Sequence, residues 1–166
     1  SPLWRRLMDQ VADGTADAGC ALDLSLIAQL LGERETGLLI QRQAIVFHQL
    51  YRSPCSARPP RLRVLALAAD IDMGGNTPIE FLLEDSGIEL QTLYVVDGMK
   101  LPERLPDHDV AIVVASDSDE CRGALRIIDQ AAAGWPKPLL NPPQLIVKLD
   151  RDKLCQLLHG IEGLDI

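Results

Sequence analysis

The sequence is poor in the residues that carry most metal and nucleic-acid chemistry. Aromatic residues make up only 4% of the 166 residues, and the three histidines are scattered. The four cysteines, at positions 20, 55, 121 and 155, form no C-x-x-C pair, so close zinc-ligand spacing is absent. We expect four reduced and mostly packed thiols rather than a disulfide framework or a metal site.

Basic residues are also scarce relative to acidic ones. The chain holds 16 Lys and Arg against 24 Asp and Glu, which gives a net charge of −8 and an isoelectric point near 4.8. This balance argues against nucleic acid or an anionic membrane as the main partner. Neither a signal peptide pattern nor an apolar run of roughly 18 residues occurs, so we expect a cytoplasmic protein without a membrane span.

What the sequence does contain is enough apolar material for a core, at 47% of all residues. In the first third of the chain, apolar residues recur with helical spacing over residues 3–12, 22–31 and 35–51. Gly32 is a stop signal between the second and third of these helices. The pattern therefore predicts an N-terminal helical segment that includes an antiparallel pair.

This helical pair resembles a single degenerate tetratricopeptide-type hairpin. Ala44, Phe47, Tyr51 and Pro54 stand at positions similar to the ending of such a repeat. One repeat cannot form a solenoid, because repeats of this kind bury their faces against neighbours. We expect a helical subdomain packed against the C-terminal part of the chain; the alternative is a helical module that binds a partner protein.

The spacing of apolar residues changes from helical to strand-like after a proline-rich linker at residues 53–61. Strand-length apolar runs occur at 62–69, 88–96, 109–115 and 138–140, and they alternate with expected helices at 77–86, from Ser116 or Ser118, and at 150–159. Such alternation predicts an α/β fold with a small parallel, Rossmann-like sheet. We divide this part of the sequence from what precedes it, giving a helical segment (1–58) and an α/β domain (59–146).

A glycine-rich loop, Gly74–Glu80, comes after the first long strand. Paired glycines allow a close approach of backbone to ligand, and free N–H groups at a helix start suit a carboxylate or phosphate. Thr77 and Glu80 also fit a capping box with Pro78 at the first helical position, which explains these residues without a ligand. A dinucleotide-binding fingerprint is not supported, because a third spaced glycine is missing.

Acidic residues stand directly after two of the predicted strands. Asp70 and Asp72 come after the first, and Asp117 and Asp119 after the third. They are explained as solvated loop acids and as capping or first-turn residues of a helix. The functional alternative is a magnesium site like that of a signalling receiver domain, built on Asp70, Asp72 and Asp117. The glycine loop is foreign to that family.

Residues 62–166 resemble the beginning of an ATP-grasp carboxylate–amine ligase. In that superfamily a small α/β domain, the pre-ATP-grasp domain, ends in an Asn-x-Pro type turn, after which come an Asp-Lys pair and a Gly-Ile segment. The corresponding residues here are Asn141, Pro143, Asp152, Lys153, Gly160 and Ile161. The proline that the family usually has next is absent, since the chain continues as GIEGLDI.

The resemblance implies a substrate-side role for the loop after the first strand. The residues expected to border the substrate are Gly74, Gly75, Asn76, Thr77 and Glu80. The substrate would be an amino-acid or peptide carboxylate, joined to an amine through an acyl-phosphate. The resemblance also implies that residues 147–166 are the start of an ATP-grasp module, and we expect the Mg-ATP site of the parent enzyme to lie beyond Ile166. We therefore expect a non-catalytic N-terminal part of a ligase, with no metal, cofactor or catalytic residue of its own.

Overall fold

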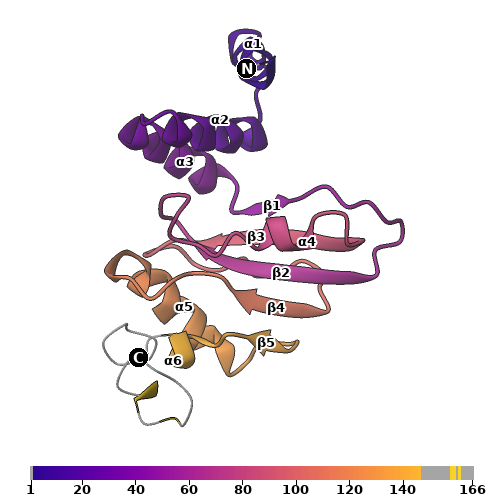
Figure 1. Cartoon of the computed structure of the whole chain (residues 1–166), viewed down its shortest axis with the longest axis vertical. Coiled ribbons are helices and arrows are strands. Elements are labelled where there is room, and N and C mark those ends of the chain that lie inside the picture. The colour runs from indigo at the N-terminus through magenta and orange to yellow at the C-terminus, as the bar shows by residue number, and fades with distance from the viewer. Residues whose placement is uncertain (1, 147–157, 160, 162–166) are drawn as a thin grey trace.

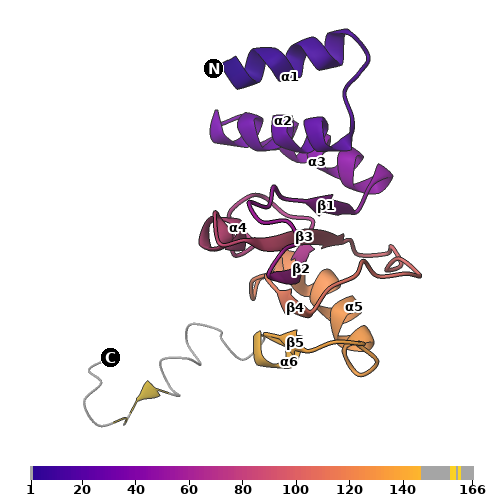
Figure 2. The same cartoon turned by 90° about the vertical axis from the view of Figure 1, so that its right-hand side faces the viewer.

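The computed structural model describes residues 2–146, 158, 159 and 161, which form helices packed against one five-stranded sheet (Figures 1 and 2). The helices are α1 Pro2–Ala12, α2 Ala18–Leu30, α3 Arg34–Phe47, α4 Ile79–Leu83, the 3₁₀ turn η1 Asp119–Cys121, α5 Arg122–Ala132 and α6 Pro143–Ile146. The strands are β1 Leu50–Arg52, β2 Leu62–Ala69, β3 Ile88–Val95, β4 Val110–Val113 and β5 Leu139–Leu140. No described helix is long and apolar enough to cross a membrane.

The sheet confirms the α/β prediction, with one difference in strand direction. Its order is β1-β3-β2-β4-β5, and the four strands from β2 to β5 pair in parallel. β1 pairs antiparallel with β3, so the sheet is mixed rather than wholly parallel. The continuous apolar run of β2 is explained by its central place, because a strand covered on both faces has no solvent-facing side.

The two faces of the sheet are covered unequally. On one face, Leu65 and Leu67 of β2 pack with Leu125 and Ile128 of α5, together with the loop that joins β3 to β4. The other face carries Val64, Ala66 and Leu90 and is packed against the short helix α4. A helix of five residues with no buried residue covers far less of a sheet than α5 does.

The helical segment lies beyond the β1 end of the sheet, with α1 outermost and α2 and α3 between α1 and β1 (Figures 1 and 2). Helices α2 and α3 approach closely because position 37 is glycine. A Cβ at Gly37 would lie 2.7 Å from the carbonyl oxygen of Ser25 and 2.6 Å from the Gln29 side chain. Leu7 of α1 packs against α2 in a small separate cluster with Cys20.

The prediction of one helix over 35–51 is wrong at its end. Helix α3 stops at Phe47, His48 adopts an extended conformation, and residues 50–52 form β1. Pairing with β3 explains the change, since Tyr94 donates its N–H to the Gln49 carbonyl and Ser53 donates to the Leu90 carbonyl. Tertiary strand pairing thus overrides the local helical period.

The apolar stripe expected on this helix is also only partly buried. Ala44 and Ile45 are buried, but Phe47 is 86% exposed and Leu39 is 61% exposed. The buried face of α3 includes the polar residue Gln41 instead. Phe47, one of the residues on which the tetratricopeptide-type resemblance rests, is therefore not an internal packing residue.

The predicted capping box at Thr77 and Glu80 is wrong. Helix α4 begins at Ile79, its N-cap is Pro78, and no side chain caps it. The reason is that the Thr77 N–H bonds the Val114 carbonyl at 2.8 Å, next to an antiparallel bridge between Asn76 and Ala115 just after β4. The helix expected over 77–86 is reduced to five residues.

The C-terminal part of the α/β region agrees with the sequence more closely. Ser118 caps the 3₁₀ turn before α5 by accepting the Cys121 N–H, and Asp119 lies in the first turn. A brief helix begins at Pro143, and Asn141, with a φ of 50°, lies in the turn before it, where the Asn-x-Pro type turn is expected. Residues 150–157 of the predicted helix at 150–159, which include the Asp-Lys pair, lie outside the described residues.

Candidate functional site

The glycine loop lies at the carboxyl ends of two adjacent parallel strands, β2 and β4. From β2 the chain passes to β3 on one side, and it then returns to β4 on the other side. Such a reversal of strand order is the place where open α/β sheets usually bind ligands. The structure therefore puts the predicted loop at the position that this fold class favours for a site.

The loop is held in place by its own side chains and backbone. The Asn76 side-chain amide accepts the Ala69 N–H at 2.8 Å and donates to the Ala69 carbonyl at 2.9 Å. It thereby makes the two hydrogen bonds that the backbone of a neighbouring strand would make at the end of β2. On the other side, Ser116 donates its N–H to the Gly75 carbonyl at 3.2 Å. Asn76 is thus a structural residue whose polar atoms are already satisfied.

The two glycines have different reasons to be glycine. A Cβ at Gly75 would fall 1.8 Å from Cδ1 of Ile71, so Gly75 is needed for packing. A Cβ at Gly74 would meet only the Asp72 carboxylate at 3.8 Å, which is an ordinary contact. No contact among the described residues requires a glycine at position 74, and this residue is exposed to solvent.

The loop offers fewer free hydrogen-bond donors than the sequence suggested. The N–H groups of Gly75 and Thr77 are bonded to the carbonyls of Asp72 and Val114. The exposed groups left for a ligand are those around Gly74 and the hydroxyl of Thr77, which has no hydrogen bond among the described residues. A ligand would therefore contact the outer rim of this loop and not a ring of inward N–H groups.

Glu80 does not join this rim. It lines a cleft between α4 and the segment Ser53–Ser56, on the side of β3. Burial raises the pKa of Tyr94 to about 12, and the charge of Glu80 is the next largest cause. The structure therefore brings together four of the five predicted site residues, Gly74 to Thr77, and places the fifth beside a different cleft.

The segment just before the glycines is tied to the helical segment by a polar network that the sequence did not predict. The buried Gln41 amide of α3 donates to the Asp70 carboxylate at 3.1 Å and to the Ile71 carbonyl at 2.8 Å. Gln29 of α2 donates to the Gln41 side-chain oxygen at 3.1 Å and accepts the Met73 N–H at 3.0 Å. The two helices thus position the chain that leads into the loop.

Two of the three acidic residues considered for a magnesium site, Asp70 and Asp72, have other partners. Asp72 pairs with Arg34 at 2.8 Å, and Asp70 lies 3.9 Å from Arg42 as well as accepting from Gln41. Asp119 pairs with Arg122 one turn further along the chain. In the described part of the chain, no three His, Cys, Asp or Glu residues come together as a set that could hold a metal.

Two aromatic hydroxyl groups lie on the β1 side of the sheet. Tyr51 and Tyr94 meet edge to face with ring centroids 5.8 Å apart. Burial, and then the charge of Asp17, raises the pKa of Tyr51 to about 12. The Tyr51 hydroxyl is buried without a hydrogen-bond partner in the described structure.

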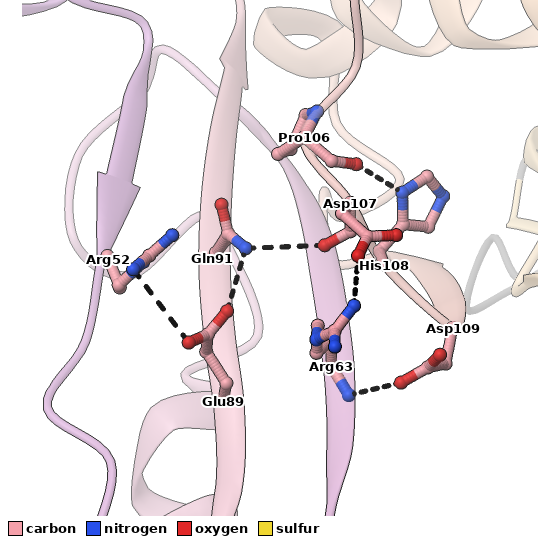
Figure 3. Close-up of polar contacts among 8 residues, drawn as sticks. All are labelled: Arg52, Arg63, Glu89, Gln91, Pro106, Asp107, His108 and Asp109. Atoms are coloured by element: carbon pink, nitrogen blue, oxygen red, sulfur yellow. Dashed lines mark hydrogen bonds and ion pairs between the residues drawn. The ribbon is translucent and has the colours of Figure 1, made fainter. Parts of the chain in front are cut away.

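A second polar network occupies the opposite, amino-terminal end of the sheet (Figure 3). The buried Gln91 side chain donates to Glu89 at 3.0 Å and reaches the Asp107 carbonyl at 3.5 Å, while Arg63 pairs with the Asp107 carboxylate. Arg52 of β1 lies 3.9 Å from Glu89. These contacts fasten the loop before β4 to β2 and β3 and join β1 to β3, so we assign them a structural role.

His108 in the same loop is also structural. Its Nε2 accepts the indole N–H of Trp135 at 3.2 Å, so Nδ1 carries the proton and donates to the Pro106 carbonyl at 2.8 Å. Both ring nitrogens are occupied in a site with only 3% exposure. This arrangement leaves no nitrogen for a metal or a substrate proton.

The thiols fit the prediction of packed, reduced cysteines where they can be seen. Cys20 and Cys121 are buried and Cys55 is half-buried, all three without a disulfide. Cys121 lies behind the glycine loop, with its Sγ 3.9 Å from the Gly75 carbonyl oxygen. Cys155 lies outside the described residues.

Comparison with known proteins identifies no family for the chain. No protein-family model, curated protein or solved structure matches it.

Proposed function

We propose that this chain is a substrate-side α/β unit that binds a small carboxylate ligand at the rim formed by Gly74 and Thr77. The observation that carries the proposal is the position of this exposed loop, at the carboxyl ends of β2 and β4 where the strand order reverses. The glycine at position 74 supports it, since no contact among the described residues accounts for that residue.

The proposal keeps the parent activity suggested by the resemblance to ATP-grasp ligases. In such a parent, this unit would hold an amino-acid or peptide carboxylate while Mg-ATP, bound by a further module, activates a carboxylate as an acyl-phosphate. The rigid support of the loop fits this role, because a substrate-holding loop has to keep its geometry through the reaction. The chain itself would bind substrate without hydrolysing ATP.

The test is an amide NMR titration of the full chain with amino acids and dipeptides, each paired with the same compound as a C-terminal amide. We expect the free acids to shift the resonances of residues 74–77 and the amides to have little effect. Thr77→Ala should weaken the response without changing thermal stability, because the Thr77 hydroxyl has no partner among the described residues. Shifts elsewhere only, or equal shifts with the amides, would refute the carboxylate site.

A titration with Mg-ATP provides the complementary control. We expect no tight binding, since the nucleotide site is proposed to lie in a different module. Tight binding of Mg-ATP by this chain alone would contradict the assignment of a substrate-side unit.

A further inference from the structure

A cleft of about 480 Å³ lies between α4 and the extended segment Ser53–Ser56, on the sheet face opposite α5. Leu83, Ile88 and Leu90 form an apolar floor from α4 and the first half of β3. The volume is within the range of about 300–1,000 Å³ that is typical of ligand-binding pockets. It is a separate place from the glycine loop, which lies at the carboxyl ends of β2 and β4.

The rim of this cleft carries uncompensated negative charge. Glu80, Glu84 and Asp85 line it, all three are exposed, and none forms an ion pair with a Lys or Arg in residues 2–146. Glu80 lies in the first turn of α4 and Glu84 is its C-cap residue, so the rim receives a carboxylate from each end of this short helix. The last turn of α4 also has no basic residue, although a cation is favourable at a helix C-terminus.

One exposed aromatic side chain also lines the cleft. Phe81, which lines the cleft, is 73% exposed, and its neighbour Leu82 is 77% exposed. A phenyl ring beside carboxylates can hold a cation over its face while the carboxylates neutralise it. This combination of apolar floor, exposed aromatic ring and acidic rim is complementary to a group that is both apolar and basic.

We propose that the cleft binds a peptide segment of another protein in which one large apolar side chain is flanked by Lys or Arg. The apolar side chain would fill the floor over Leu83 and Leu90, and the basic side chains would reach the carboxylates on the rim. A net charge of −8 favours approach of a basic partner and opposes a second copy of the same chain. The inference does not rest on the proposed carboxylate site.

The test selects a random-sequence peptide library on the full chain and measures the enriched peptides by fluorescence anisotropy. We expect enriched sequences to combine a large apolar residue with neighbouring Lys or Arg. Phe81→Ser and Glu84→Lys should each weaken binding about tenfold, because they remove the aromatic wall and reverse one rim charge. Both residues are exposed, so the fold should tolerate the changes.

Two matched variants serve as controls. Leu82→Ser removes an equally exposed apolar residue of α4 that does not line the cleft, and Glu103→Lys makes the same charge change in a distant loop. Both should keep wild-type affinity. The proposal is overturned if no sequence is enriched, if enriched peptides lack basic residues, or if the controls weaken binding as much as the cleft variants. Self-association that Phe81→Ser abolishes, or equal affinity for a simple alkylamine, would assign the cleft to another occupant and overturn it too.

Discussion

Individual residues of the glycine loop divide into those that hold the loop and those that face solvent. Gly75 and Asn76 are accounted for by the contact with Ile71 and by the two hydrogen bonds to Ala69. Gly74 and Thr77 have exposed surface that no contact among the described residues explains. The proposed ligand contacts are therefore confined to the second pair.

This division predicts that alanine substitutions at the two glycines change the free energy of unfolding by different amounts. Gly75→Ala should lower the free energy of unfolding by about 1–3 kcal/mol, because its Cβ would overlap the Ile71 side chain. Gly74→Ala should change it by less than about 0.5 kcal/mol, since its Cβ has room. Urea denaturation of both variants measures the difference. Equal destabilisation would show that Gly75 does not pack against Ile71.

The buried side-chain amide of Gln41 should also contribute to the free energy of unfolding. Gln41→Leu would leave the Ile71 carbonyl and the Gln29 side chain without this partner, at a cost of about 1–3 kcal/mol of unfolding free energy. Gln43→Leu, on the exposed side of the same helix, should have little effect and serves as the control. If the two changes were equivalent in urea denaturation, the network would not hold the helices to the sheet.

These residues show what the sequence can and cannot reveal at this scale. The glycine pair and the asparagine stand out as a loop, but the partner of each polar atom depends on distant segments. Gln41 is separated from Asp70 by a whole linker and strand, so local pattern gives no sign that it is buried. The capping box at Thr77 failed for the same reason, because a bond to Val114, the residue just after β4, outweighs a local cap.

Among the elements, the central strands β2 and β3 are predicted more closely than the helices α3 and α4. The predicted limits of the central strand β2 match the observed ones, because a fully buried strand is a continuous apolar run. The predicted helix over 35–51 is too long, since residues 50–52 fit a helical period as well as a strand. The short helix α4 depends on packing against the sheet and has no strong helical signal of its own.

This contrast predicts a gradient of local stability. Amide hydrogens of β2 and β3 should exchange with solvent slowly, at rates near those of global unfolding, because they lie in the middle of the sheet. Amides of α4 should exchange much faster, since it has five residues and none is buried. Hydrogen exchange measured by NMR or mass spectrometry gives both rates in one experiment. Protection of α4 equal to that of β2 would contradict the uneven covering of the two faces.

At the scale of the whole molecule, helices α2 and α3 contact the loop that precedes the glycines through a polar junction. Gln41, Arg34 and Gln29 all reach residues 70–73. The separation into a helical segment and an α/β domain, which the sequence suggests, stays a prediction. The strand β1, which the sequence assigned to the helical segment, extends the sheet in the structure.

Whole-molecule stability should fall at alkaline pH. Burial raises the pKa of Tyr51 and of Tyr94 from 10.0 to about 12, which means that the folded state disfavours their ionised forms. This stabilisation is fully present below pH 10 and is lost as the pH rises toward 12. The chain contains only these two tyrosines, so tyrosinate absorbance reports on both. Tyr94→Phe isolates Tyr51, and titration of both near 10 would contradict their burial.

The proposed carboxylate site at the exposed rim of the glycine loop is tested most directly by calorimetric titration of a matched glycine pair. Gly74→Val and Gly134→Val both add a side chain where the protein leaves room, but only position 74 lies in the proposed site. With a dipeptide chosen from the NMR screen, we expect Gly74→Val to weaken binding at least about tenfold and Gly134→Val to bind like the wild type. Unchanged affinity in Gly74→Val would contradict a carboxylate site at this rim.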